Sequence, residues 1–100
     1  MYLSRDPWNI VAMIRTWQAC DVAGGGDLGG ALGAVQARAL VMPGRTDLYF
    51  PPEDSEIEVG LMPDARLEVI PSDWGHYAGG GRNPDDTAFI DRHLARLLAE

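Results

Sequence analysis

Hydrophobic residues follow a helical repeat near the start of the chain. Apolar side chains recur there at intervals of three and four residues: Ile10, Met13, Ile14 and Trp17. This spacing places them on one face of a helix. Asp6 followed by Pro7 is typical of an N-cap and a first helical position. The pattern predicts a helix within residues 1–21 whose apolar face packs in a core.

The segment of residues 22–36 breaks this pattern and contains six glycines. Glycine-rich loops can bind phosphate, but no strand is predicted before this segment and no Lys-Ser or Lys-Thr pair follows it. We therefore interpret it as a flexible connector in which Asp27 caps a short turn of helix.

Two short and mainly apolar runs each end at a proline and precede a residue capable of chemistry. Residues 39–42 are followed by Asp47, and residues 67–70 are followed by His76. Such runs are typical of buried strands in a parallel sheet, whose carboxyl ends meet at one edge. We therefore expect the Asp47 and His76 side chains to lie within hydrogen-bond reach.

A helix is predicted between these two strands. Two prolines and two acidic residues occupy positions 51–54, where proline suits the first helical turn and the acids suit the helix dipole. Gly60 marks the expected end of this helix. Strand, helix and strand form a βαβ unit over residues 37–82, so the two strands should be parallel with a right-handed crossover. The predicted fold class is α/β, with flanking helices.

The last segment, residues 83–100, is also predicted to be a helix. Asn83 is placed to cap it, and Pro84 occupies its first turn. Large apolar side chains recur at helical spacing and predict a buried face: Ile90, Leu94, Leu97 and Leu98. His93 lies at the flank of that face, where we expect solvent-exposed surface.

The composition limits the classes of partner. The chain has 100 residues, enough for one small domain, and its 46% of hydrophobic residues argues against a disordered chain. A net charge of −7 argues against nucleic acid and anionic membrane, which attract basic surfaces. No stretch approaches the roughly 20 apolar residues of a membrane span. Residues 1–9 lack the apolar core of a signal peptide, so a cytoplasmic location is expected.

Metal binding is not indicated by the sequence. The chain has one cysteine, Cys20, and two histidines, His76 and His93, and these show no metal-ligand spacing such as H-x-x-x-H or C-x-x-C. We therefore expect no metal and no bound cofactor.

The order of these segments resembles the α/β-hydrolase superfamily, and within it the homoserine O-acetyltransferase-like branch. LVMPGRTDLYFPPEDSE, residues 40–56, is similar to the penultimate strand and acid loop of that family. LEVIPSDWGHYAG, residues 67–79, is similar to its last strand and histidine loop, and residues 6–21 resemble a tryptophan-containing helix of this branch. The resemblance implies that Asp47 is the acid and His76 the base of a catalytic triad.

The nucleophile of that family is not found in the sequence. It sits in a G-x-S-x-G turn, and none of Ser4, Ser55 and Ser72 has glycine two residues away on both sides. Cys20 has no such turn around it either. We therefore expect residues 1–100 to form a single partial domain, the C-terminal part of an α/β-hydrolase fold. The N-terminal half with the nucleophile is absent on this interpretation, and the chain alone should be inactive.

The resemblance implies an acyl-transfer segment that acts on a small-molecule acyl donor or ester. It leaves open an acyltransferase, with acetyl-CoA as one candidate donor, and an ester hydrolase. Homoserine acetyltransferases continue Gly-His with Asp-Ala-Phe-Leu, whereas His76 is followed by Tyr77 and Ala78, so the acceptor also stays open. The alternative is a non-catalytic, truncated or split-gene module that associates with a partner. Because residues 39–42 would form an unpaired edge, we expect self-association or pairing with the missing N-terminal segment.

Overall fold

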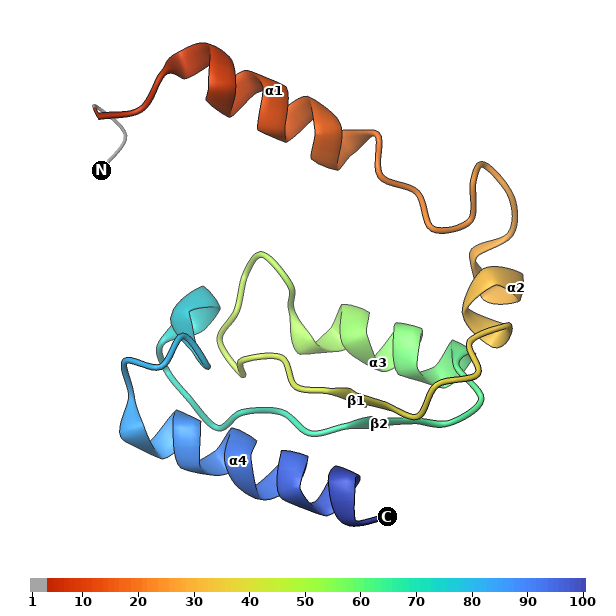
Figure 1. Ribbon diagram of the computed structural model, residues 1–100, viewed down its shortest axis with the longest axis vertical. Helices are drawn as coiled ribbons and strands as arrows, with labels where there is room; N and C mark the ends of the chain where they lie inside the picture. Colours follow the sequence, from red (N-terminus) through yellow and green to blue (C-terminus); the bar gives the residue numbers. More distant parts are fainter. Residues whose placement is uncertain (1–3) are drawn as a thin grey trace. The chain divides into compact units, whose positions relative to one another are not determined.

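The computed structural model describes residues 4–100 and divides the chain into two compact units, Met1–Ala31 and Leu32–Glu100. The first unit contains helix α1 (Pro7–Gln18), and α2 (Leu28–Gly33) crosses the boundary between the units (Figure 1). That boundary falls inside the predicted connector. Asp27 caps α2 as predicted, because its carboxylate accepts hydrogen bonds from the Gly29 and Gly30 amides at 3.1 and 2.9 Å.

Helix α1 begins as predicted. The Asp6 carboxylate accepts a hydrogen bond from the Trp8 amide at 2.9 Å, and Pro7 is the first helical residue. Within the first unit the predicted packing of its apolar face in a core is not found, since no residue of α1 is buried and Met13 is 63% exposed. Within its own unit α1 has only the glycine-rich turns and the first residues of α2 as neighbours, and these cannot cover a helix of 12 residues.

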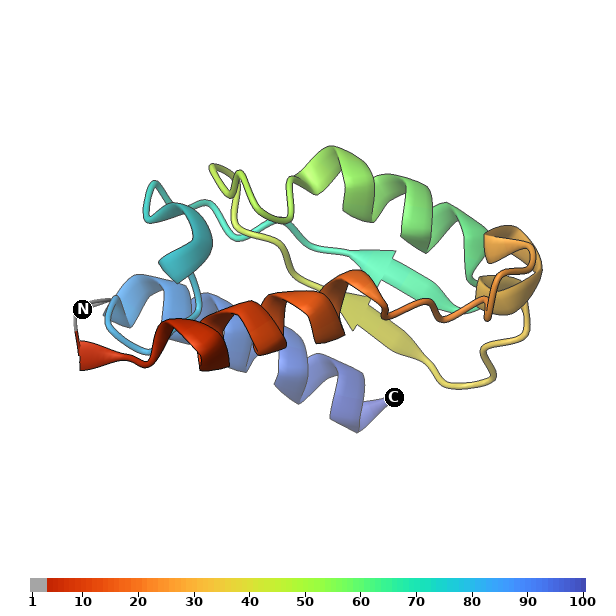
Figure 2. The same cartoon turned by 90° about the horizontal axis from the view of Figure 1, so that it is seen from above.

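The second unit is an α/β structure with two parallel strands. β1 (Ala39–Val41) pairs with β2 (Ala65–Leu67), and α3 (Pro52–Leu61) connects them. The short helix η2 (Gly75–Tyr77) and α4 (Pro84–Ala99) follow β2. Figures 1 and 2 show the strand pair between α3 and α4. The predicted parallel βαβ arrangement is therefore confirmed.

Each strand is shorter than predicted. Pro43 follows the end of β1 and has no amide proton for the ladder, yet the two segments stay parallel beyond it. The Ile70 amide donates to the Pro43 carbonyl at 2.8 Å, and Gly44 and Ile70 form an isolated parallel bridge. This extension carries the chain directly into the two loops that contain Asp47 and His76.

Helix α3 runs one residue past the predicted end. Pro52 is its first residue, and Glu53 and Asp54 lie in its first turn, as predicted. The helix continues through Gly60 and ends at Leu61, with Met62 in extended conformation. The reason is that Pro63 disfavours helical backbone in the residue before it, so proline rather than glycine sets the end.

The buried face of α4 differs from the predicted one. Asn83 caps the helix, accepting from the Asp85 amide at 3.0 Å. The face turned toward the protein is formed by Asp86, Ile90, His93 and Leu97. Leu98 is 85% exposed, and the His93 side chain is only 14% exposed, so the predicted exposure of His93 and burial of Leu98 are wrong. The buried Asp86 in the first turn sets this rotation, because residues four, seven and eleven positions later lie on its side.

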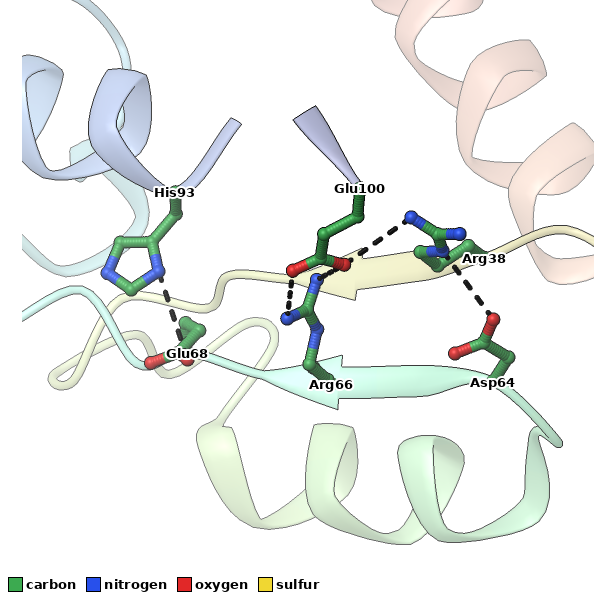
Figure 3. Close-up of polar contacts among 6 residues, drawn as sticks. All are labelled: Arg38, Asp64, Arg66, Glu68, His93 and Glu100. Carbon is green, nitrogen blue, oxygen red and sulfur yellow. Dashed lines mark hydrogen bonds and ion pairs between the residues drawn. The ribbon is translucent and has the colours of Figure 1, made fainter. Parts of the chain in front are cut away.

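Charged side chains hold the end of α4 to the strands (Figure 3). The Glu100 carboxylate accepts two hydrogen bonds from Arg66, each 2.8 Å long, and one from Arg38 at 3.4 Å. The bonds from Arg66 hold the pKa of Glu100 below its ordinary value. His93 Nδ1 lies 3.8 Å from Glu68 Oε1. These contacts are mostly exposed to solvent, so they orient the helix end more than they stabilise it.

The apolar core is small. Among residues 4–100, Ile70 is the single buried hydrophobic side chain, at 2% exposure. In the same part of the chain no helix combines the length and apolar character that crossing a membrane requires. A core of this size gives little hydrophobic stabilisation, which becomes important for the association state of the chain.

Candidate active site

Asp47 and His76 meet at the carboxyl ends of the two strands. Asp47 lies in the acid loop (residues 43–51) after β1, and His76 lies in η2 within the histidine loop (residues 71–83) after β2. Figure 1 shows both loops at the same end of the strand pair. His76 Nδ1 lies 3.0 Å from Asp47 Oδ2. The expected approach of these two side chains is confirmed.

The Asp47 carboxylate is buried and fixed by its own loop. Its Oδ1 accepts hydrogen bonds from the Tyr49 amide at 2.8 Å and the Phe50 amide at 3.2 Å, which leaves Oδ2 facing His76. Partial burial raises the pKa of Asp47, whereas the hydrogen bonds from His76, Phe50 and Tyr49 lower it. Together the hydrogen bonds outweigh the effect of burial, so the pKa of Asp47 lies below its ordinary value. Asp47 is therefore ionised at neutral pH.

The bond to Asp47 determines the tautomer of His76. An ionised carboxylate can only accept hydrogen bonds, so the ring proton resides on Nδ1 and Nε2 carries a free lone pair. The ring packs against Tyr49 and Phe50, with centroid distances of 4.8 and 5.4 Å. The His76 side chain is nonetheless 48% exposed. His76 is thus an oriented, accessible base whose reactive nitrogen is available for proton transfer.

The acid and histidine loops are packed tightly against each other. A Cβ added to Gly44 would lie 2.9 Å from the Gly75 carbonyl oxygen, so only glycine fits at this position. Gly75 itself has φ +56°, a left-handed conformation that favours glycine. Thr46 links the loops further, since its hydroxyl donates to the Ser72 carbonyl at 3.2 Å and accepts from the Gly75 amide at 3.0 Å. The separation of Asp47 and His76 is therefore set by several contacts around them.

The sequence did not indicate the roles that three polar residues of this region have in the structure. Thr46 bridges the loops, and the buried Ser72 donates its hydroxyl to the buried Asp86 at 2.8 Å. Position gave a weak signal for Thr46 and Ser72, because both follow strand ends, as Asp47 and His76 do. For Asp86 the sequence indicated an exposed side chain, since an acid in a first helical turn is normally an exposed partner of the helix dipole.

The described residues offer no evident metal centre. Within residues 4–100, no group of three or more histidine, cysteine, aspartate or glutamate side chains is placed to hold a metal ion. Ser72 is the serine nearest to His76 in the sequence, but its hydroxyl is directed to Asp86. The arrangement supplies an acid and a base that can act on a nucleophile presented at Nε2 of His76.

Comparison with known proteins identifies ester hydrolases as relatives. No protein-family model matches the chain. A "Probable esterase" of Corynebacterium glutamicum is 35% identical over 100 residues, which cover 98% of this chain and 29% of that protein. Ethyl acetate hydrolase of Pseudomonas veronii is 35% identical over 96 residues, covering 94% of this chain and 28% of that protein. The chain thus spans less than a third of the length of these relatives.

Solved structures give the same result. An acetylester hydrolase from Corynebacterium glutamicum matches with a TM-score of 0.87 and 35% identity, covering 97% of this chain and 28% of that one. The acetyl esterase MekB matches with a TM-score of 0.87 and 35% identity, covering 96% and 28%. The chain is therefore similar, in sequence and in fold, to a segment of acetyl ester hydrolases.

Proposed function

We propose that this chain is a segment of an ester hydrolase of the α/β-hydrolase fold, in which Asp47 is the acid and His76 the base of a catalytic triad. The observation that carries the proposal is the 3.0 Å contact between Asp47 Oδ2 and His76 Nδ1 at the ends of two parallel strands. An acid that holds a histidine in one tautomer is the arrangement on which triad catalysis depends. The ester hydrolases among its relatives support an ester as the substrate.

The proposed reaction has two halves, the formation of an acyl-serine and its hydrolysis. In each half His76 accepts one proton and returns it. Its Nε2 accepts the proton of a serine hydroxyl while the serine oxygen bonds to the ester carbonyl carbon. Asp47 stabilises the imidazolium that forms. When the bond to the alcohol breaks, Nε2 gives this proton to the departing oxygen and an acyl-serine remains. Water then repeats the sequence, so that ester and water yield acid and alcohol.

The serine nucleophile is proposed to come from polypeptide outside this chain. The chain corresponds to 28–29% of the length of its relatives, and we assign it the acid and the base of the site. A triad acts as a unit, so removal of one member removes nearly all of its effect. On this proposal the 100 residues alone hydrolyse no ester.

The proposed substrate is an acetate ester of a small alcohol. One relative is named ethyl acetate hydrolase, and the solved structures are an acetylester hydrolase and an acetyl esterase. Acetyl transfer from a donor such as acetyl-CoA to an alcohol would use the same acid and base, as in the homoserine O-acetyltransferase-like branch. Water or alcohol as the acceptor distinguishes the two reactions. The cytoplasmic location expected from the sequence also remains a prediction.

A non-catalytic module is the second candidate. The small core favours it, because among the described residues Ile70 alone is a buried hydrophobic side chain. Exposed apolar surface of this extent favours association with other polypeptide. Both candidates therefore include a partner, either another copy or the remainder of a hydrolase. They differ in whether Asp47 and His76 take part in a reaction.

A chimera tests the proposed function. The matching segment of the Corynebacterium glutamicum acetylester hydrolase is replaced by this chain, and hydrolysis of an acetate ester is measured. We expect hydrolysis, with a loss in kcat of about 10⁴-fold in Asp47→Asn and about 10⁶-fold in His76→Ala. Asp73→Asn is the matched control, because Asp73 is an exposed acid of the histidine loop that pairs with Arg45. Full activity of the His76→Ala chimera would show that His76 is not the base.

A further inference from the structure

Asp86 is an unusual residue for the start of a helix, because its carboxylate is buried. It is 4% exposed, whereas the neighbouring Asp85 is exposed. A buried carboxylate is costly unless hydrogen bonds compensate for the lost water. Asp86 Oδ2 accepts one such bond from the Ser72 hydroxyl at 2.8 Å, and Ser72 is also 4% exposed. The first turn of α4 lowers the cost further through the helix dipole.

The Ser72 hydroxyl transmits this contact to the backbone before His76. Its oxygen accepts a hydrogen bond from the Trp74 amide at 3.2 Å while it donates to Asp86. The next amide, of Gly75, donates to the Thr46 hydroxyl at 3.0 Å. Two side-chain hydroxyls therefore hold the two amides that directly precede His76. One hydroxyl is anchored on α4 by Asp86, and the other comes from the acid loop.

The Ser72 hydroxyl has a defined hydrogen-bond direction, since it donates to Asp86 and accepts from the Trp74 amide. An ionised carboxylate can only accept, so the Ser72 proton must point to Asp86 and the serine lone pairs remain for the Trp74 amide. An asparagine at position 86 offers a donor as well as an acceptor, so the Ser72 hydroxyl would no longer be held in a single direction. The contact between Asp86 and Ser72 is thus a directed hydrogen bond and more than a space-filling contact.

We propose that Asp86 is a positioning residue that holds His76 against Asp47 through Ser72. The inference rests on the proposed function for its catalytic meaning, but its structural content can be tested without activity. Asp86 contacts neither His76 nor any reacting atom in this proposal. Its effect is to restrict the histidine loop, so that the Nδ1 proton of His76 stays on Asp47 and Nε2 stays free.

The test is histidine ring NMR of the whole chain labelled with ¹⁵N-histidine. The chain has two histidines, and the His76→Ala variant assigns their signals. A hydrogen-bonded Nδ1 proton gives a downfield resonance that exchanges slowly with water. In Asp86→Asn and in Ser72→Ala we expect exchange of the His76 proton to accelerate about tenfold, as for loss of one buried hydrogen bond. Asp85→Asn, the same charge change one residue earlier, should leave this proton unchanged.

Non-additivity separates a shared network from two independent effects. If Asp86 acts through Ser72, the double variant should exchange no faster than either single variant. Ser72→Ala removes only the hydroxyl and keeps the Asp86 carboxylate at the start of α4, so it is a second variant if Asp86→Asn unfolds. Unchanged His76 exchange in folded variants would overturn the positioning role. So would unfolding of both, because the contact would then support the whole unit and not the histidine.

The wild-type spectrum distinguishes this inference from the proposed function. Loss of the His76 signal in Asp47→Asn, together with unchanged exchange of the His76 proton in folded Asp86→Asn and Ser72→Ala, overturns the positioning role and leaves the Asp47–His76 pair intact. Absence of a slowly exchanging His76 proton at a temperature where the wild-type chain is folded counts against the pair itself, and with it against the positioning role.

Discussion

Gly44 lies so close to the histidine loop that a Cβ added to it would stand 2.9 Å from the Cβ of Ala78. Asp47 is three residues further along, and His76 is two residues before Ala78. The space left by one missing side chain therefore lets the acid and histidine loops pack at the distance that the Asp47–His76 hydrogen bond requires. A methyl group at this point would push the loops apart.

Gly44→Ala is accordingly expected to destabilise the chain by about 1–3 kcal/mol, the usual cost of overpacking. Gly60→Ala is the control, because Gly60 lies in α3 with nothing within 4 Å of an added Cβ. It should stabilise the chain by about 0.5–1 kcal/mol, since alanine is the better helix former. Chemical denaturation of both variants measures the two effects. Equal stabilities would mean that the loops do not pack as described.

The pKa of Asp47 gives a second prediction, on pH dependence. Because hydrogen bonds lower this pKa in the folded state, the ionised carboxylate contributes stability that is fully present above its ordinary pKa of about 4. This contribution is lost as pH falls through the lower, folded pKa. A ¹³C NMR titration of the Asp47 carboxyl should show a midpoint below the ordinary value. In His76→Ala the midpoint should rise, and an unchanged midpoint would contradict the contact.

The rotation of α4 gives a third prediction. Leu97 is partly buried and Leu98 is 85% exposed, although the two are neighbours in sequence. Leu97→Ala should lower the free energy of unfolding by about 1–2 kcal/mol, less than for a fully buried leucine. Leu98→Ala should change it by less than about 0.5 kcal/mol, as is usual for exposed sites. Comparable losses in both variants in thermal unfolding would instead support the face predicted from the sequence, which contains both leucines.

A fourth prediction concerns association. Because Ile70 is the single buried hydrophobic side chain of the described residues and two-stranded sheets are marginal alone, the purified chain should be weakly stable or self-associated. Sedimentation velocity should then show species larger than a monomer, or thermal unfolding should occur near room temperature. For an associating chain the unfolding midpoint should rise with protein concentration. A compact monomer with a cooperative transition well above room temperature would contradict this prediction.

The sequence by itself determined the features that depend on neighbouring residues. Asp6 with Pro7 and Asn83 with Pro84 marked the starts of α1 and α4, because capping joins residues only two or three positions apart. The order of strand, acid, helix, strand and histidine also predicted the meeting of Asp47 and His76. Parallel strands joined by one helix bring their carboxyl ends together whatever the details of packing.

The tertiary structure alone decided which helix faces are buried. The apolar face of α1 matches a helical repeat, yet no residue of α1 is buried, because burial requires a partner surface that periodicity cannot supply. In α4 the contact of Asp86 with Ser72, 14 residues earlier, turns His93 inward and Leu98 outward. Such a contact joins distant parts of the chain. No local pattern could therefore predict that a charged residue would define the buried face of α4.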